Sequence, residues 1–159
     1  MKRSVFVLFF LSGALFLAAC GKSNQIGAKP RMHPVHGIEV WAAVGPLAGV
    51  NTAKANGALE EHCFKDGFCS QIVRLNIYPP KDKGLMYVAW LQDADTNALV
   101  KLGKLSNPAG DVRYVLNRED KRDVGSFLRI LVSLEKSESI TAPGQSVAEG
   151  MLKVVPLAQ

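Results

Sequence analysis

The chain has 159 residues, of which 48% are hydrophobic and 21% charged, and its formal net charge is +5 at pH 7. A chain of this length is expected to form one domain around a single core. Basic and acidic residues are mixed along it, without a block of like charges or a basic stripe interleaved with aromatic residues, so nucleic acid is not an expected partner.

The N-terminal segment has the three parts of an export signal. Lys2 and Arg3 supply positive charge, residues 5–17 are almost wholly apolar, and positions 17–20 read Leu-Ala-Ala-Cys, with small residues directly before Cys20. This order resembles the bacterial lipoprotein signal, in which the cysteine sulfur receives a diacylglyceryl group, the preceding bond is cut and the new amino terminus is acylated. The resemblance implies a signal peptide over residues 1–19 and a lipid anchor at Cys20.

A transmembrane anchor and a plain secretory signal are the other two interpretations of this segment. Against a transmembrane anchor, the apolar run from Ser4 to Ala19 is shorter than the roughly 20 residues that a helix needs to cross the hydrocarbon core. Loss of Lys2 and Arg3 with the signal would leave 17 basic against 14 acidic residues, so the net charge would fall to +3.

The lipoprotein signal also implies a location. Gly21 follows the cysteine, where aspartate would favour retention in the inner membrane. We therefore expect a lipid anchor in the outer membrane, facing the periplasm, or in the cell membrane of a host with a single membrane. More than one acyl chain is needed there, because a single chain gives only marginal and reversible binding.

Residues 20–35 are predicted to be a lipidated tether, because they are rich in polar residues, glycine and proline and contain few large apolar groups. At the end of this segment, Met32 and His33, followed by His36, place a thioether beside two imidazoles, and these ligands suit copper. One interpretation is therefore a copper-handling segment. We favour the other, a solvated linker, because one methionine and two histidines in such a segment are neither preorganised nor repeated.

Residues 36–159 are predicted to form an all-β domain, a two-sheet immunoglobulin-like sandwich of seven or eight strands. Apolar and polar residues alternate over 38–44, 73–77 and 128–135, whereas residues 86–91 are apolar on both faces and indicate a central strand. Turn-forming residues separate these stretches. Residues 48–61 are ambiguous, because their alanines and leucine also allow a helical turn.

Cys63 and Cys69 remain as a pair once Cys20 is assigned to lipid. Exported cysteines are normally oxidised, and Asp66-Gly67 between them favours a tight turn, so we expect a disulfide bond. The alternative is a redox or metal-binding pair assisted by His62, although this spacing is not a recognised zinc or thioredoxin spacing.

Several short motifs follow one another over residues 57–155. One strand has the pattern Tyr-X-X-Trp-Leu, the next Leu-Gly-X-Leu and a third Val-Ser-X-Glu, and a Pro-Gly turn precedes a closing strand. This series resembles the extracytoplasmic domain of the anti-sigma-K factor family, which is a β-sandwich. We interpret the motif residues first as determinants of the fold. They are Tyr87, Trp90, Leu91, Gly103, Glu135, Pro143 and Gly144.

The resemblance implies only part of what an anti-sigma-K factor does. That family also has a cytoplasmic helical domain, which holds the sigma factor, and a membrane helix, and we expect neither part here. What remains is the outer module, used for protein recognition or for sensing in the envelope. We therefore expect two partners, the membrane through the lipid and another envelope protein.

Catalytic chemistry has little support in the residues. No histidine falls in the body of the predicted sandwich to activate a nucleophile, so we expect no enzymatic activity and no cofactor. Asp93, Asp95 and Asn97 offer oxygen ligands at alternate positions for a weak calcium site, although charged surface loops are the simpler interpretation. The leading hypothesis is a non-catalytic, membrane-tethered envelope protein, and the alternative is copper handling by the tether.

Overall fold

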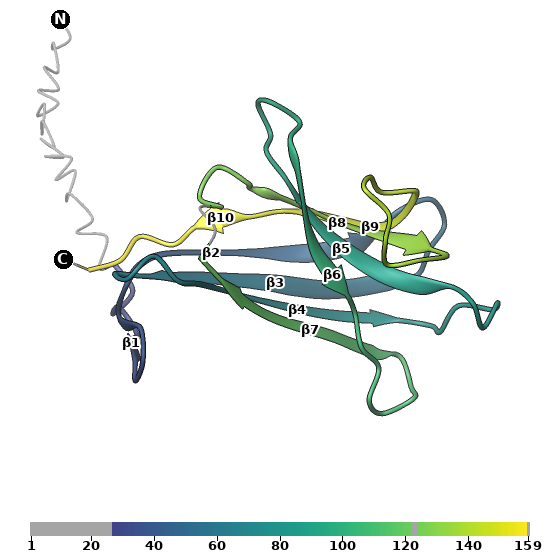
Figure 1. Ribbon diagram of the computed structural model, residues 1–159, viewed down its shortest axis with the longest axis horizontal. Coiled ribbons are helices and arrows are strands. Elements are labelled where there is room, and N and C mark those ends of the chain that lie inside the picture. The colour runs from purple at the N-terminus through teal and green to yellow at the C-terminus, as the bar shows by residue number, and fades with distance from the viewer. Residues whose placement is uncertain (1–26, 122–123, 159) are drawn as a thin grey trace, which may run out of the picture.

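The computed structural model describes residues 27–121 and 124–158, and the ribbon there consists of strands and connecting loops (Figure 1). The expectation of an all-β fold is confirmed. None of the described residues belongs to a helix that could span a bilayer. The strands are β1 (Met32–His33), β2 (Gly37–Gly49), β3 (Ala55–Phe64), β4 (Cys69–Ile77), β5 (Met86–Gln92), β6 (Leu99–Lys104), β7 (Arg113–Asp120), β8 (Arg129–Glu135), β9 (Gln145–Met151) and β10 (Lys153–Val154).

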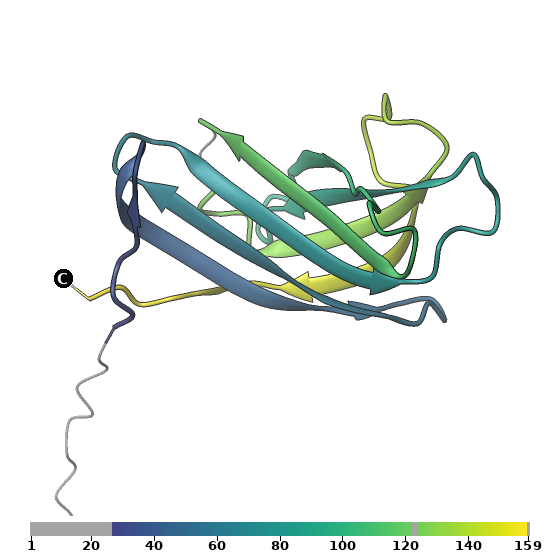
Figure 2. The same cartoon turned by 90° about the horizontal axis from the view of Figure 1, so that it is seen from below.

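The strands join in the antiparallel order β6-β5-β8-β9-β2-β3-β4-β7, and the short strands β1 and β10 also pair with β2. This sheet folds into two layers, β6-β5-β8-β9 and β2-β3-β4-β7, which face each other in Figures 1 and 2. The layers are continuous where β2 pairs with β9, at Ala48 and Glu149. Opposite this junction, a bridge between Ser106 and Val115 brings the chain after β6 against β7. The predicted two-layer sandwich is therefore confirmed.

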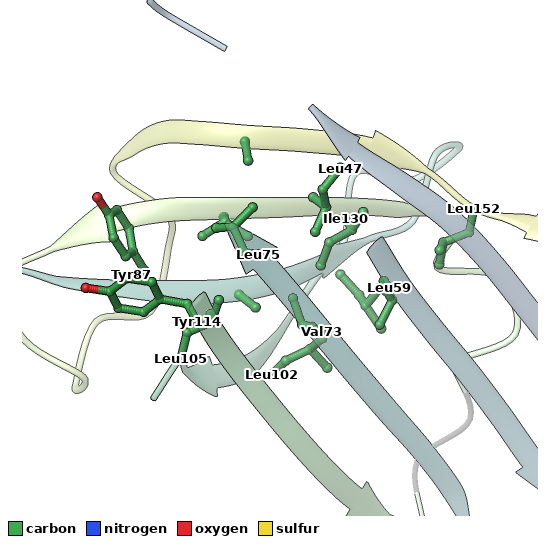
Figure 3. Packing of buried hydrophobic residues seen from close by; sticks show 14 of the residues in the cluster. Leu47, Leu59, Val73, Leu75, Tyr87, Leu102, Leu105, Tyr114, Ile130 and Leu152 are labelled. Carbon is green, nitrogen blue, oxygen red and sulfur yellow. The ribbon is translucent and has the colours of Figure 1, made fainter. Parts of the chain in front are cut away.

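The hydrophobic core lies between the two layers (Figure 3). Leu59 and Val73 from one layer and Ile130 and Val132 from the other have no exposed surface. Residues that alternate along a strand point to the same face, which is why the period-two pattern of the sequence becomes one shared core. Burial of each large aliphatic side chain contributes about 1.5–3 kcal/mol, so contact between the layers is the main stabilising interaction.

Strand β5 is buried on both faces, as its continuous apolar sequence predicts. Leu91 belongs to the core between the layers, whereas Trp90 points the opposite way and packs with Val88 and Leu131 in a second, smaller cluster. The Trp90 indole Nε1 donates a hydrogen bond of 2.9 Å to the Ser133 hydroxyl. The indole is therefore buried without leaving its one donor unpaired.

The segment 48–61, for which the sequence allowed a helical turn, instead forms the end of β2, a tight turn and most of β3. Asn51 and Thr52 adopt positive φ angles of 50° and 70° in the turn. Gly49 is required beside them, because a Cβ there would lie 2.0 Å from the Ala53 carbonyl oxygen. Pairing of β3 with strands on both sides and burial of Leu59 outweigh the helical preference of the alanines.

The described part of the predicted tether is not free of the domain. Ala28 forms a parallel bridge with Leu157, and Met32 of β1 lies opposite Ile38 of β2. The Glu39 amide also donates a hydrogen bond of 2.9 Å to the Arg31 carbonyl. The domain therefore includes residues 28–35 and not only residues from 36, because the open edges of β2 and of the C-terminal segment accept the backbone of this polar segment.

Candidate functional site

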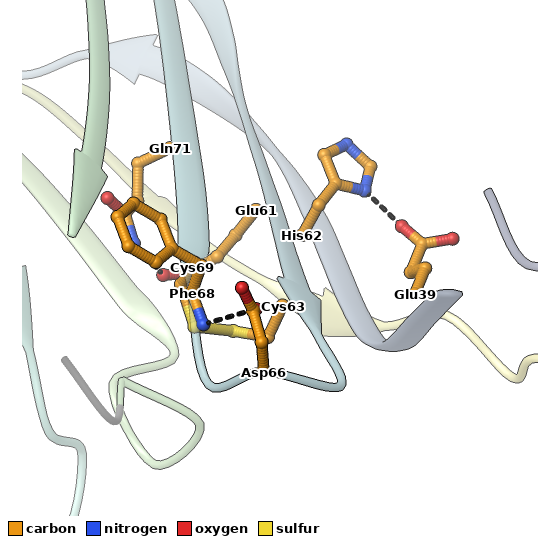
Figure 4. The surroundings of a disulfide bond; sticks show 8 residues. All are labelled: Glu39, Glu61, His62, Cys63, Asp66, Phe68, Cys69 and Gln71. Atoms are coloured by element: carbon orange, nitrogen blue, oxygen red, sulfur yellow. Dashed lines mark hydrogen bonds and ion pairs between the residues drawn. A yellow bond between two sulfur atoms is a disulfide. The ribbon is translucent and has the colours of Figure 1, made fainter. Parts of the chain in front are cut away.

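The disulfide bond between Cys63 and Cys69 closes the hairpin of β3 and β4, and the prediction of this bond is confirmed (Figure 4). The two cysteines lie directly opposite each other, with their Cα atoms 4.1 Å apart. Gly67 has a φ of 82°, which glycine adopts without strain, and the Asp66 carboxylate accepts a hydrogen bond of 3.0 Å from the Phe68 amide. The Asp-Gly turn thus places the two cysteines opposite each other, and the disulfide holds this turn closed.

Four aromatic rings cover this hairpin, and we call His33, His36, Phe64 and Phe68 the aromatic stack. The His36 ring lies on Phe68 with a centroid distance of 4.0 Å and on His33 with a distance of 4.7 Å. His36 Nδ1 also lies 2.8 Å from the Asp66 carboxylate. Hydrogen bonds from His36 and from the Phe68 amide hold the pKa of Asp66 below its usual value. The stack therefore joins the β1–β2 turn to the disulfide hairpin.

The predicted copper ligands do not converge in this arrangement. A nitrogen lone pair lies in the plane of its imidazole, and the His33 and His36 planes are nearly parallel, at 23°, so the lone pairs do not meet at one ion about 2 Å from each nitrogen. His33 Nδ1 already accepts hydrogen bonds from two backbone amides, and Met32 is 73% exposed. Residues 27–121 and 124–158 contain no group of three or more histidine, cysteine or acidic side chains placed to hold a metal.

His62 belongs to a different face of β3 from Cys63, because consecutive side chains of a strand alternate. Its Nδ1 lies 2.5 Å from a Glu39 carboxylate oxygen, and its Nε2 lies 3.0 Å from the Arg31 guanidinium (Figure 4 shows the first contact). Since arginine has only donors, Nε2 accepts and the proton sits on Nδ1. Both ring nitrogens are thus occupied, Nε2 by Arg31 and Nδ1 by Glu39, whose other oxygen accepts a hydrogen bond from the Arg31 amide. His62 therefore does not assist the cysteine pair.

Glu61 and Gln71 are fully buried polar residues beside the disulfide (Figure 4). Gln71 Nε2 donates a hydrogen bond of 3.1 Å to Glu61 Oε1, while Glu61 Oε2 has no hydrogen-bond partner among the described residues. Burial raises the pKa of Glu61 to about 7, the Gln71 hydrogen bond opposes this shift, and the charge of Asp120 adds to it. Sequence reasoning missed this pair, although both residues break the apolar pattern at core positions of two strong strands.

The acidic loop between β5 and β6 is an ordered turn. The Asp93 carboxylate accepts hydrogen bonds from the Asp95 and Thr96 amides, at 3.0 and 2.8 Å. These bonds, with the Ser126 and Thr96 side chains, lower the pKa of Asp93 to about 2. Asn97 provides a positive φ of 59°, which closes the turn. The Asp93 oxygen suggested as a calcium ligand is therefore used by the turn itself.

The motif residues lie in or against the layer β6-β5-β8-β9. Gly103 has a φ of 133° in β6, next to the irregular pairing with β5. The buried Glu135 carboxylate accepts a hydrogen bond of 2.6 Å from the Gly144 amide, which joins the end of β8 to the end of the loop that contains Pro143. Tyr87 donates its hydroxyl hydrogen to the Tyr78 carbonyl at 2.8 Å. These contacts are within the fold, and the cysteine of the lipoprotein motif, Cys20, lies outside the described residues.

A groove lies at the end of the molecule away from the disulfide, and we call it the Tyr78 groove. Tyr78 follows the end of β4 and is 71% exposed, and two adjoining cavities of about 430 and 380 Å³ open beside it. Loop 78–85 lies at the opposite end of the ribbon from the C-terminus (Figure 1). The groove is lined by Lys54, Ile77, Tyr78, Pro79, Pro80 and Leu85.

Comparison with models of known protein families gave no match, and comparison with curated proteins gave no significant relative.

The disulfide is predicted to contribute stability without being essential for folding. Replacing Cys63 and Cys69 together by serine should lower the free energy of unfolding by about 2 kcal/mol, because the cross-link restricts the unfolded chain over a short loop. Urea and thermal denaturation measure this loss. Each single serine variant should form more intermolecular disulfides than the double variant, since it retains one free thiol. Unchanged thermal stability of the double variant, or ready alkylation of the native protein, would contradict this role.

Glu61 is predicted to make stability depend on pH. Its folded pKa of about 7 lies above the usual 4.5, so the folded state binds the proton more tightly. Binding of this proton adds about 3 kcal/mol to the free energy of unfolding below pH 4.5, and this contribution is lost as the pH rises through 7. Glu61→Gln should remove that slope from urea-denaturation measurements across this range.

A matched control for this prediction is Glu60→Gln. Glu60 is adjacent in sequence but points to the other face of β3, where its carboxylate pairs with Arg74. This variant should keep the wild-type slope between pH 4.5 and 7. If Glu61→Gln keeps the slope as well, Glu61 is not the group that titrates.

Proposed function

We propose that the protein is a non-catalytic lipoprotein of the bacterial envelope, whose β-sandwich resembles the outer domain of anti-sigma-K factors and binds another envelope protein or senses conditions there. The observation that carries this proposal is the placement of the motif residues. Separate short motifs from β5, β6, β8 and the turn before β9 come together in one layer of the sandwich. This placement in one layer is expected if the motifs belong to one structural module.

The contacts among these residues support the same proposal. Glu135 binds the Gly144 amide, and Trp90 binds Ser133 of the adjacent strand β8. Strand formation alone does not require a glutamate and a glycine at positions nine residues apart. Here a hydrogen bond joins them across the loop between β8 and β9, so the Val-Ser-X-Glu and Pro-Gly motifs are in contact. This contact supports the proposed resemblance, and the sigma-binding function of that family is not carried over.

The lipid anchor is proposed from Leu-Ala-Ala-Cys at residues 17–20, and the arrangement of the termini fits it. The Ala28 amide donates a hydrogen bond of 2.7 Å to the Pro156 carbonyl, and the Ala158 amide donates one of 2.9 Å to the Ala28 carbonyl. The chain therefore enters the domain at the same end at which its C-terminal segment leaves. A lipid at Cys20 would hold this end toward the membrane, which we propose to be the outer membrane, on its periplasmic face.

The Tyr78 groove is the surface that we propose for protein recognition. An exposed tyrosine beside prolines and aliphatic side chains offers apolar contact with a hydroxyl for hydrogen bonding, and tyrosine is enriched at interface hot spots. The Tyr87 hydroxyl fixes the Tyr78 backbone, so the side chain is presented from a rigid base. Its position away from the termini leaves it open to a partner in the envelope.

Metabolic labelling tests the anchor. Cells that produce the native protein and are given an alkyne-labelled fatty acid should incorporate the label, and Cys20→Ala should not, because the sulfur is the acylation site. Density-gradient fractionation should place the native protein with outer-membrane markers. Label in the Cys20→Ala variant, or native protein in inner-membrane fractions, would contradict the anchor or its location respectively.

Site-specific photocrosslinking tests the binding surface. A photoreactive residue in place of Tyr78 should give a discrete crosslinked product in intact cells. The same residue in place of Leu99, an exposed position on β6, serves as the matched control and should give no such product. Equal products from both positions, or none from position 78, would count against recognition at the Tyr78 groove.

A further inference from the structure

Exposed apolar side chains are concentrated at the end of the molecule that carries the termini. Among the described residues, the exposed large hydrophobic side chains other than Tyr78 and Leu99 all come from segments 32–44 and 151–154. Several of them line one groove of about 490 Å³. We call this surface and its neighbour Met32 the apolar overhang. It consists of Met32, Ile38, Val40, Trp41, Val154 and Pro156.

The strand pairing explains why these residues form one surface. Ile38 and Val40 are two positions apart on β2, and Met32 lies directly opposite Ile38. The C-terminal segment adds Val154, which pairs beside them on β2. Ile38, Val40 and Val154 are 41%, 55% and 48% exposed, so the described residues leave much of this apolar area facing solvent.

The length of chain before the domain shows what can cover this surface. Ala28 is hydrogen bonded to Pro156, which belongs to the apolar overhang. Cys20 lies eight residues earlier, and eight extended residues reach at most about 29 Å. If Cys20 carries the lipid, these eight residues therefore keep the overhang close to the bilayer surface.

Positively charged side chains around the overhang also favour contact with an anionic membrane. Lys29, Lys65 and Lys153 are exposed; Lys65 and Lys153 adjoin overhang residues, and Lys29 adjoins Pro30, which lines the same groove. Lys29 and Lys153 precede Pro30 and Val154, and the Lys65 amide donates a hydrogen bond of 3.0 Å to the Ile38 carbonyl. Each lysine near an anionic membrane surface is attracted to it, and its long side chain reaches the headgroups while apolar neighbours insert deeper.

We propose that the apolar overhang inserts into the interfacial region of the bilayer that holds the Cys20 lipid, so that the domain stands on this end. The inference rests on the proposed lipid anchor. Insertion of a few aliphatic side chains is weak by itself, but the anchor supplies a high local concentration of membrane. In this orientation the Tyr78 groove points away from the bilayer.

Tryptophan fluorescence tests the proposal, because the chain has two tryptophans and only Trp41 belongs to the overhang. Trp90 is buried in the other layer, at 1% exposure. Purified lipid-modified protein is reconstituted into vesicles of phosphatidylethanolamine and phosphatidylglycerol whose acyl chains carry bromine. Emission should fall relative to unbrominated vesicles, by about twofold for the Trp41 component. A Trp41→Phe variant should show no such fall.

Paired charge variants locate the contact. Val40→Asp combined with Val154→Asp should abolish the quenching while the protein still floats with the vesicles through its lipid. Leu99→Asp, at an exposed apolar position outside the overhang, should keep the wild-type quenching. Thermal denaturation checks that both variants are folded, and the wild-type measurement decides the question even if one is not.

The outcomes separate the two proposals. Native protein that floats with vesicles but shows no quenching overturns docking of the overhang and leaves the anchor intact. Quenching that survives the paired substitutions in folded protein also overturns docking through these residues. Protein that carries no lipid and does not float overturns the anchor and, with it, the docking that depends on it.

Discussion

Close backbone contact between β2 and the strands at the end of the chain holds the two layers together. A Cβ at Gly150 would lie 1.9 Å from the Pro46 carbonyl oxygen, and a Cβ at Gly45 would lie 2.3 Å from the Met151 carbonyl oxygen. Only glycine permits this approach. Because β2 also pairs with β1, β3 and β10, the same strand organises both layers and both termini.

This organisation gives the molecule two chemically different ends. Three kinds of contact hold the chain together at the end with the termini. They are the disulfide, the aromatic stack and the polar contacts of His62, and they lie next to the buried Glu61. The Glu61 carboxylate, one oxygen of which has no hydrogen-bond partner among the described residues, is unfavourable when ionised. The disulfide lies two residue pairs further along the same hairpin and compensates for a cost of similar size. At the other end, the described loops around the Tyr78 groove contain no disulfide, and the ion pair there joins Asp111 to Arg113, only two residues along the chain.

The motif residues carry the proposed resemblance, whereas the proposed contacts with a membrane and with a partner protein depend on surfaces and on the proposed N-terminal signal. Glu135 and Gly144 maintain a turn, and Trp90 fills a cluster on the outer side of β5, so the motifs describe how one layer is built. Fold by itself does not define a function. The apolar overhang and the Tyr78 groove lie at opposite ends, which would let one end meet the membrane while the other meets a protein.

The sequence by itself determined the all-β class, the central strand β5 and the disulfide, because period-two alternation and an Asp-Gly turn act over a few residues. It did not determine the role of His33, His36 and His62, because ring stacking and the contacts with Glu39 and Asp66 join segments far apart in the chain. It also left residues 48–61 undecided, and it placed the end of the tether at residue 35, whereas Ala28 and Met32 already pair with the domain. Only the tertiary structure decided these, since backbone pairing with β2, β4 and the C-terminal segment outweighs local preference.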